Sequence, residues 1–136
     1  MNEQKTILIV EDEADESTYL GALFEDHGFA VISAGNGREG FEKAKSRHPD
    51  LITLDISMPG ESGVRMFRDL QGDPETSDIP VIVITGITHD FKRFIETRKQ
   101  VRPPEGYFDK PPDRDQLLAK INEILSVKSR APNSPP

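Results

Sequence analysis

The sequence predicts an α/β domain in which a parallel β-sheet carries helices on both faces. Two features of the 136-residue chain predict this class: short apolar blocks rich in Ile, Val and Leu, and amphipathic stretches that separate them. Strands that alternate with helices form parallel sheets through right-handed crossovers, and helices then cover both faces. We therefore expect a doubly wound sheet built from a repeated βα unit over residues 1–126.

The apolar blocks are the predicted strands. Most are continuous aliphatic runs, which fit strands that are buried on both faces of a parallel sheet. The second block is less uniform and fits a strand at the edge of the sheet. In chain order the predicted strands are "TILIV" at 6–10, "FAVISA" at 29–34, "LITLD" at 51–55, "IPVIVIT" at 79–85 and "GYFD" at 106–109.

The stretches between and after these blocks are the predicted helices. Apolar residues three or four positions apart mark a buried face. Asn36 followed by Glu39, and Asp113 followed by Gln116, are residue pairs that start helices. Gly28 fits the left-handed position just past the end of a helix. The predicted helices span residues 14–27, 36–47, 62–71, 88–101 and 113–126.

Composition and charge exclude several classes of function. The formal net charge of −7 argues against direct binding to nucleic-acid phosphates. No cysteine is present, which excludes disulfides and thiolate metal sites. No apolar stretch has the length of a membrane span or of a signal core, so we expect a cytoplasmic protein. Residues 127–136 are rich in Pro and Ser and are expected to form a disordered tail.

Polar and charged side chains follow four of the predicted strands. Glu11 and Asp12 come after the first strand, Asp55 ends the third, Thr85 ends the fourth, and Lys110 follows the fifth. The carboxyl ends of parallel strands meet at one edge of the sheet, which is where doubly wound folds bind ligands. Three carboxylates, a hydroxyl and an ammonium are therefore predicted to gather there.

This set of residues favours phosphoryl chemistry. Clustered carboxylates repel one another unless a cation binds, and oxygen ligands without cysteine favour Mg²⁺. An aspartate is also a known nucleophile for phosphoryl groups, and it forms an aspartyl phosphate. Catalysis would then rest on positioning and on neutralising the charge of the phosphoryl oxygens.

The motifs that carry these residues resemble one known family. "ILIVEDE", "LDISMPGESG", "VIVITG" and "YFDKP" occur in that order on the predicted strands. Together they resemble the response-regulator receiver domain of bacterial two-component signalling over about residues 5–126. The resemblance implies a flavodoxin-like fold of five βα units with the strand order 2-1-3-4-5.

The resemblance also implies roles for the acidic residues. Asp55 matches the aspartate that accepts a phosphoryl group from the phosphohistidine of a sensor histidine kinase or a phosphotransfer protein. Glu11 and Asp12 match the acidic pair that helps to hold Mg²⁺. Ser57 lies where the family supplies a backbone carbonyl to the metal. Such a protein promotes only its own phosphorylation and dephosphorylation.

The remaining roles concern the switch that reports phosphorylation. Thr85 matches the hydroxyl that moves toward the phosphate, Lys110 the lysine that pairs with it, and Tyr107 the aromatic rotamer switch. The bond between Lys110 and Pro111 matches a peptide that is usually cis in the family. The switching surface would be the fourth helix, fifth strand and fifth helix. Because only a short tail follows, we expect a stand-alone receiver whose output is contact with an unidentified downstream protein; a chain cut from a longer protein is the alternative.

The approach to the fifth strand departs from the family pattern. Pro112 stands where the family often has Phe, and "VRPPEGY" replaces the usual small residues. Pro103 and Pro104 are expected to end the fourth helix. That helix is also basic, which favours a solvated face and leaves docking of an acidic partner as the alternative. Its basic residues are Lys92, Arg93, Arg98, Lys99 and Arg102.

Other functions compete with the receiver hypothesis. An aspartate-nucleophile phosphohydrolase often carries a second acid two residues after the nucleophile, whereas Ser57 stands there. A flavodoxin-like cofactor binder needs a first loop that accepts phosphate, but "VEDEADE" is acidic and has no glycine. Each residue also has a structural alternative: Asp55 as a turn former, Glu11 and Asp12 as a helix cap, Thr85 as a plain strand residue and Tyr107 as core.

Overall fold

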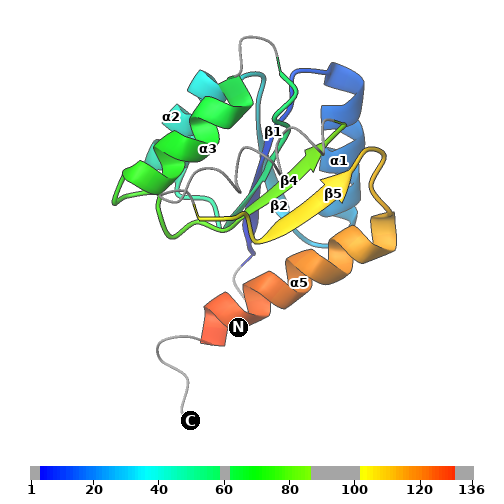
Figure 1. Ribbon diagram of the computed structural model, residues 1–136. Coiled ribbons are helices and arrows are strands. Elements are labelled where there is room, and N and C mark those ends of the chain that lie inside the picture. Colours follow the sequence, from blue (N-terminus) through cyan, green and yellow to red (C-terminus); the bar gives the residue numbers. More distant parts are fainter. Residues whose placement is uncertain (1–3, 59–61, 87–101, 131–136) are drawn as a thin grey trace.

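A five-stranded parallel sheet with helices on both faces forms the computed structural model, which describes residues 4–58, 62–86 and 102–130 (Figure 1). The strand order is β2-β1-β3-β4-β5. Both the α/β class and the predicted strand order are confirmed. The elements are β1 (Thr6–Val10), α1 (Ala14–Asp26), β2 (Ala30–Ala34), α2 (Gly37–Arg47), β3 (Leu51–Leu54), α3 (Ser62–Gly72), β4 (Val81–Thr85), β5 (Gly106–Asp109) and α5 (Arg114–Arg130).

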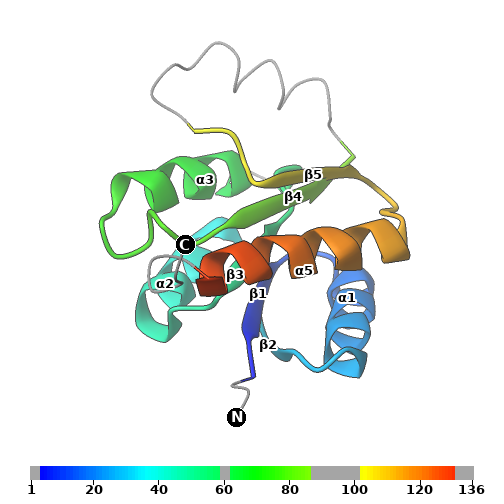
Figure 2. The same cartoon turned by 90° about the horizontal axis from the view of Figure 1, so that it is seen from below.

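Two layers of apolar side chains sandwich the sheet. Successive residues of a strand point to opposite faces, so Leu8 and Val10 of β1 join the core under α2 and α3. Ile7 and Ile9 join the core under α1 and α5. Figures 1 and 2 show these two helix pairs on opposite sides of the sheet. β1 is therefore buried on both faces, as its continuous aliphatic run predicts.

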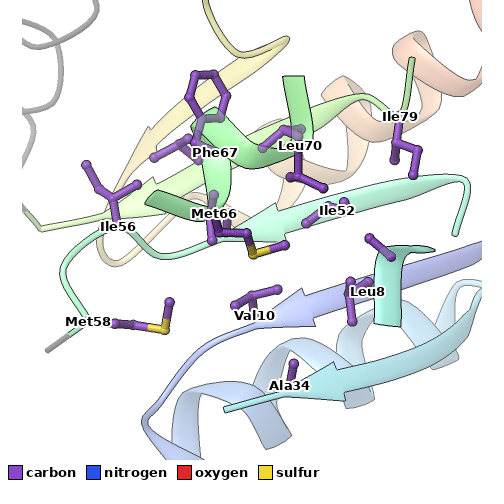
Figure 3. Close-up of a cluster of buried hydrophobic side chains, with 14 residues drawn as sticks. Leu8, Val10, Ala34, Ile52, Ile56, Met58, Met66, Phe67, Leu70 and Ile79 are labelled. Carbon is purple, nitrogen blue, oxygen red and sulfur yellow. The ribbon is translucent and has the colours of Figure 1, made fainter. Parts of the chain in front are cut away.

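The core beneath α2 and α3 extends to the carboxyl edge of the sheet. Figure 3 shows Val10, Ile56 and Met58 in the same cluster as Met66 and Phe67 of α3. All of these side chains are buried. Because Ile56 and Met58 flank the position of Ser57, their burial fixes the loop that leaves β3.

Local geometry confirms three of the predicted helix ends. Asn36 Oδ1 accepts a hydrogen bond of 2.8 Å from the Glu39 amide at the start of α2. Asp113 Oδ1 accepts one of 2.9 Å from the Gln116 amide at the start of α5. Gly28, after α1, has a φ of +91°, which is a conformation that glycine adopts without strain.

Some boundaries differ from the predicted ones. β4 begins at Val81 because the Ile79 amide bonds to Thr76 O in a turn before it. α5 continues past the predicted end at 126 to Arg130. The rest of the predicted tail, residues 131–136, lies outside the described residues. None of the described helices has the length and apolar character needed to cross a membrane.

The proline-rich approach to β5 is fastened to the rest of the domain. Gln71, near the end of α3, accepts a hydrogen bond from Arg102 N (2.7 Å) and donates one to Arg102 O (2.5 Å). The Arg102 guanidinium donates to Ser77 O at 2.8 Å. Glu105 pairs with the first residue of β4, accepting from the Val81 amide at 2.8 Å. Arg102 therefore binds its own domain, whereas the predicted helix over 88–101, with its four other basic residues, lies outside the described part of the chain.

Candidate functional site

The sheet itself brings the predicted site residues to one edge. β1 and β3 are neighbours with Val10 opposite Leu54, so Glu11 and Asp55 leave the sheet side by side. Asp55 N donates to Val10 O at 3.0 Å. On the other side, β4 pairs with β5, and Lys110 N donates to Thr85 O at 3.1 Å. The backbone thus sets the positions of residues that lie far apart in the sequence.

Lys110 is the centre of the cluster. Its Nζ lies 2.8 Å from Asp55 Oδ2, 3.1 Å from Glu11 Oε1 and 3.1 Å from Glu16 Oε1. Asp55 and Glu11 are buried, with 3% of each side chain exposed. A buried carboxylate is costly unless it is paired, and Lys110 supplies the charge that makes both burials tolerable.

Ser57 holds the other oxygen of Asp55. Its amide donates to Asp55 Oδ1 at 2.8 Å and its hydroxyl donates to the same atom at 2.5 Å. Both oxygens of the carboxylate are therefore engaged and the plane of the group is fixed. The metal-binding role of the Ser57 backbone carbonyl stays a prediction. The contacts of the Ser57 amide and hydroxyl with Asp55 were not predicted from the sequence.

The pKa values of the two buried carboxyl groups, Asp55 and Glu11, shift in opposite directions. Burial raises the pKa of Asp55, but the hydrogen bonds from Lys110 and Ser57 outweigh it, so the pKa lies below its usual value. Burial, and then the nearby charge of Asp55, raises the pKa of Glu11 to about 7. Burial lowers the pKa of Lys110, yet its contacts with Asp55, Glu11 and Glu16 raise it overall. The site thus keeps Asp55 ionised and makes Glu11 sensitive to the local charge.

The acidic residues fit a divalent cation. Glu11, Asp12 and Asp55 each offer a carboxylate oxygen, and these oxygens lie within 4.8 Å of one another. Asp12 is exposed while the other two are buried, so the group opens to solvent on one side. Oxygen-only donors of this charge suit Mg²⁺, which keeps part of its water shell.

Gly63, at the start of α3, allows this helix to approach the backbone of Asp55 and Ile56. A Cβ built on Gly63 would lie 2.4 Å from Asp55 O and 2.6 Å from Ile56 Cα. Both distances are shorter than real contacts, and the atoms belong to the backbone. The glycine at position 63 of the motif "LDISMPGESG" therefore has a steric reason, whereas Pro59 of the same motif lies outside the described residues.

Thr85 and Tyr107 lie where the sequence predicts them. Thr85 is fully buried at the end of β4. Tyr107 lies opposite Val83 and packs partly buried against the core under α2 and α3. Burial, and then the charge of Asp109, raises the pKa of Tyr107 to about 12. The peptide bond between Lys110 and Pro111 is cis, as predicted. The switching roles of Thr85 and Tyr107 remain predictions.

A groove of about 240 Å³ runs beside Lys110. Tyr19, with 53% of its surface exposed, lines it together with Leu20, Pro111 and Pro112. Asp15, Glu16 and Glu11 add negative charge, and Ile84 and Lys110 complete the lining. Sequence reasoning missed Glu16 and Tyr19, although their spacing on the first turns of α1 places both near the loop that follows β1.

Comparisons with known proteins agree on one family. Residues 7–122 match the family described as "Response regulator receiver domain". The chain is 39% identical to the protein PilH of Pseudomonas aeruginosa, over 88% of this chain and 97% of PilH. It is 31% identical to the polar-differentiation response regulator DivK of Brucella ovis, over 89% of this chain and 96% of DivK.

Solved structures agree on the fold. A CheY-like response regulator receiver domain from Methanospirillum hungatei superposes with a TM-score of 0.82 at 23% identity, over 94% of this chain and 98% of that one. At this identity the likeness shows the fold, while the family rests on the sequence matches.

Proposed function

The chain belongs to the response regulator receiver domain family, and on this premise we propose that Asp55 accepts a phosphoryl group and that its phosphorylation switches a protein-interaction surface. Receiver domains of this family are signalling proteins of two-component systems and not enzymes that act on a separate substrate. The acceptor residue, the metal ligands and the switching surface are the parts that we propose.

One observation carries the proposal: Asp55 is buried and its Oδ2 lies 2.8 Å from the Lys110 ammonium. A turn former or helix cap needs neither burial nor a lysine from a strand end 55 residues away. A nucleophile needs a fixed direction, and Ser57 with Lys110 fixes both oxygens. This arrangement supports a preorganised acceptor.

The transfer step is a displacement at phosphorus. A carboxylate oxygen of Asp55 attacks the phosphorus of a donor phosphohistidine, the P–N bond breaks as the O–P bond forms, and the donor imidazole leaves with the electron pair. Lys110 then faces the charge on the phosphoryl oxygens. Thr85 is proposed as the hydroxyl that contacts another phosphoryl oxygen once the group is in place.

Glu11, Asp12 and Asp55 are proposed to hold Mg²⁺, with the Ser57 carbonyl as a further ligand. The family typically binds Mg²⁺ through acidic residues, and the described residues include this acidic trio. When bound, Mg²⁺ supplies positive charge that offsets the phosphoryl oxygens. Asp55 and Lys110 orient the reacting groups.

The donor is proposed to be a sensor histidine kinase or a histidine phosphotransfer protein. The groove lined by Tyr19 and Pro111 beside Lys110 gives such a partner apolar surface next to the acceptor. The output is proposed to pass through the region of 88–101, β5 and α5 to a downstream protein. Tyr107 on β5 is the proposed residue that reports the state of the site.

The other two functions have less support. A phosphohydrolase would need a second acid two residues after Asp55, and Ser57 instead donates two hydrogen bonds to the nucleophile. A flavin or dinucleotide phosphate at the first loop would face Glu11, Asp12 and Glu13. A cofactor binder does not explain why Lys110 is directed at Asp55.

A phosphodonor assay tests the proposal. Wild-type protein with Mg²⁺ and a small acyl phosphate should take up about one phosphoryl group per chain, in keeping with a single acceptor carboxylate. Asp55→Asn should take up almost none. Equal uptake by Asp55→Asn would place the acceptor elsewhere, and steady release of phosphate from simple esters would favour the phosphohydrolase.

A further inference from the structure

Glu16 contacts the site from α1, although nothing in the sequence motifs assigns it a role. We propose that Glu16 is a positioning residue that competes with the phosphoryl group for the Lys110 ammonium and thereby slows phosphoryl uptake by Asp55. This inference rests on the proposed function, because it assumes that Asp55 is the acceptor.

The geometry of Lys110 motivates the proposal. An ammonium has three N–H donors, and Lys110 has three carboxylate partners: Asp55 at 2.8 Å, Glu11 at 3.1 Å and Glu16 at 3.1 Å. Only 18% of the Lys110 side chain is exposed. A phosphoryl oxygen can therefore reach Lys110 only by replacing one of these partners.

Glu16 differs from the other two partners of Lys110. Glu11 and Asp55 belong to the trio whose oxygens converge with those of Asp12, so a bound cation shares their charge. Glu16 does not belong to that trio, so a cation bound there does not share its charge. Its Oε2 also lies 3.2 Å from Lys110 Nζ, so both of its oxygens face the ammonium. Once a cation is bound, Glu16 is the partner that still holds Lys110 away from the incoming phosphoryl group.

The size of the effect follows from exposure. The Glu16 side chain is 37% exposed, so solvent screens its attraction for Lys110. We expect Glu16→Gln to take up phosphoryl groups from a small acyl phosphate roughly two- to fivefold faster than wild type, with Mg²⁺ present. Asp15→Asn is the matched control, because it removes the same charge from the neighbouring position of α1 and Asp15 makes no ion pair with Lys110. The uptake rate of Asp15→Asn should differ from that of wild type by less than half as much as the rate of Glu16→Gln does.

A double-mutant comparison shows whether Glu16 acts through Lys110. In a Lys110→Ala background, Glu16→Gln should leave the uptake rate unchanged, because the contact for which it competes is gone. A merely structural role of Glu16 would alter the rate equally in both backgrounds. That result would overturn the proposal. The proposal would also fail if Glu16→Gln took up phosphoryl groups more slowly than wild type, or at the same rate as Asp15→Asn.

Mg²⁺ binding without any phosphodonor separates this role from metal binding. Glu11, Glu13 and Glu16 also have oxygens within 4.8 Å of one another, so Glu16 has a competing role as a cation ligand. Titration calorimetry with Mg²⁺ alone should give similar affinities for Glu16→Gln and Asp15→Asn. A loss of affinity more than tenfold greater for Glu16→Gln would assign Glu16 to the metal and overturn the proposal.

The two proposals fail in different ways. If Asp55→Asn takes up as much phosphate as wild type, the proposed function fails and the Glu16 inference fails with it. If Asp55→Asn is inactive but Glu16→Gln matches the Asp15→Asn control, only the role of Glu16 is wrong.

Discussion

Asp55 lies one residue beyond β3, where its backbone is still bonded to β1 and its side chain reaches the edge of the sheet. Ser57 and Lys110 engage its two oxygens. The burial that would make a lone carboxylate costly is compensated by three hydrogen bonds from these two residues. At the scale of single residues, the site is a carboxylate made rigid by its neighbours.

Glu11 gives a testable pH dependence. Its pKa is about 7 in the folded protein and 4.5 ordinarily, so the folded state prefers protonated Glu11. This stabilisation is complete below pH 4.5 and is lost as the pH rises through about 7. Without divalent cations, Glu11→Gln should therefore gain stability relative to wild type between pH 5 and 8, by about 3 kcal/mol at most. Urea unfolding of both proteins at several pH values measures this difference in the free energy of unfolding.

Magnesium provides the control for the Glu11 prediction. A bound cation favours the ionised carboxylate, so excess Mg²⁺ should stabilise wild type more than Glu11→Gln at pH 8. If the difference between the two proteins is independent of pH in the absence of metal, the raised pKa of Glu11 is wrong.

At the scale of elements, α3 is placed by Gly63. Because a Cβ there would overlap the backbone of Asp55 and Ile56, Gly63→Ala must shift either the helix or the loop that follows β3. We expect a loss of about 1–3 kcal/mol in the free energy of unfolding and a slower phosphoryl uptake.

Gly72 is the matched control on the same helix. A Cβ on Gly72 meets nothing within 4 Å, so Gly72→Ala should be neutral or slightly stabilising. A Gly63→Ala protein as stable and as active as Gly72→Ala would contradict the proposed packing of α3 against the acceptor.

The approach to β5 gives a prediction for Gln71. Its side chain accepts from Arg102 N and donates to Arg102 O, so Gln71→Ala should speed hydrogen exchange of the Arg102 amide by about tenfold or more. Arg68→Ala, an exposed position on the same helix, is the control. Unchanged exchange at Arg102 would show that Gln71 does not hold this segment.

Sequence patterns predicted the strands and helices better than the segments that connect them. The aliphatic runs of β1, β3 and β4 are buried on both faces, as strands of this composition must be in a covered parallel sheet. The route into β5 was not predictable, because Gln71 reaches Arg102 through side-chain contacts between segments far apart in the sequence. Hydrophobic periodicity and secondary-structure propensity are properties of short sequence segments, so they do not predict side-chain contacts between distant segments.

At the scale of the whole molecule, the carboxyl edge was predictable as a location. Once β1, β3, β4 and β5 are parallel, Glu11, Asp55, Thr85 and Lys110 must share that edge. The strand order came from the family resemblance and is confirmed. The contacts of Ser57 and Glu16 were not predictable, because each depends on where a side chain points after the fold has formed.

The most direct test of the account is to locate the phosphoryl group on the chain. Protein incubated with Mg²⁺ and a small acyl phosphate can be reduced with borohydride, which converts an aspartyl phosphate to homoserine, and then mapped by peptide mass spectrometry. We expect homoserine at Asp55 and unmodified carboxylates at Glu11, Asp12 and Glu16. Modification at another carboxylate, with Asp55 intact, would contradict it.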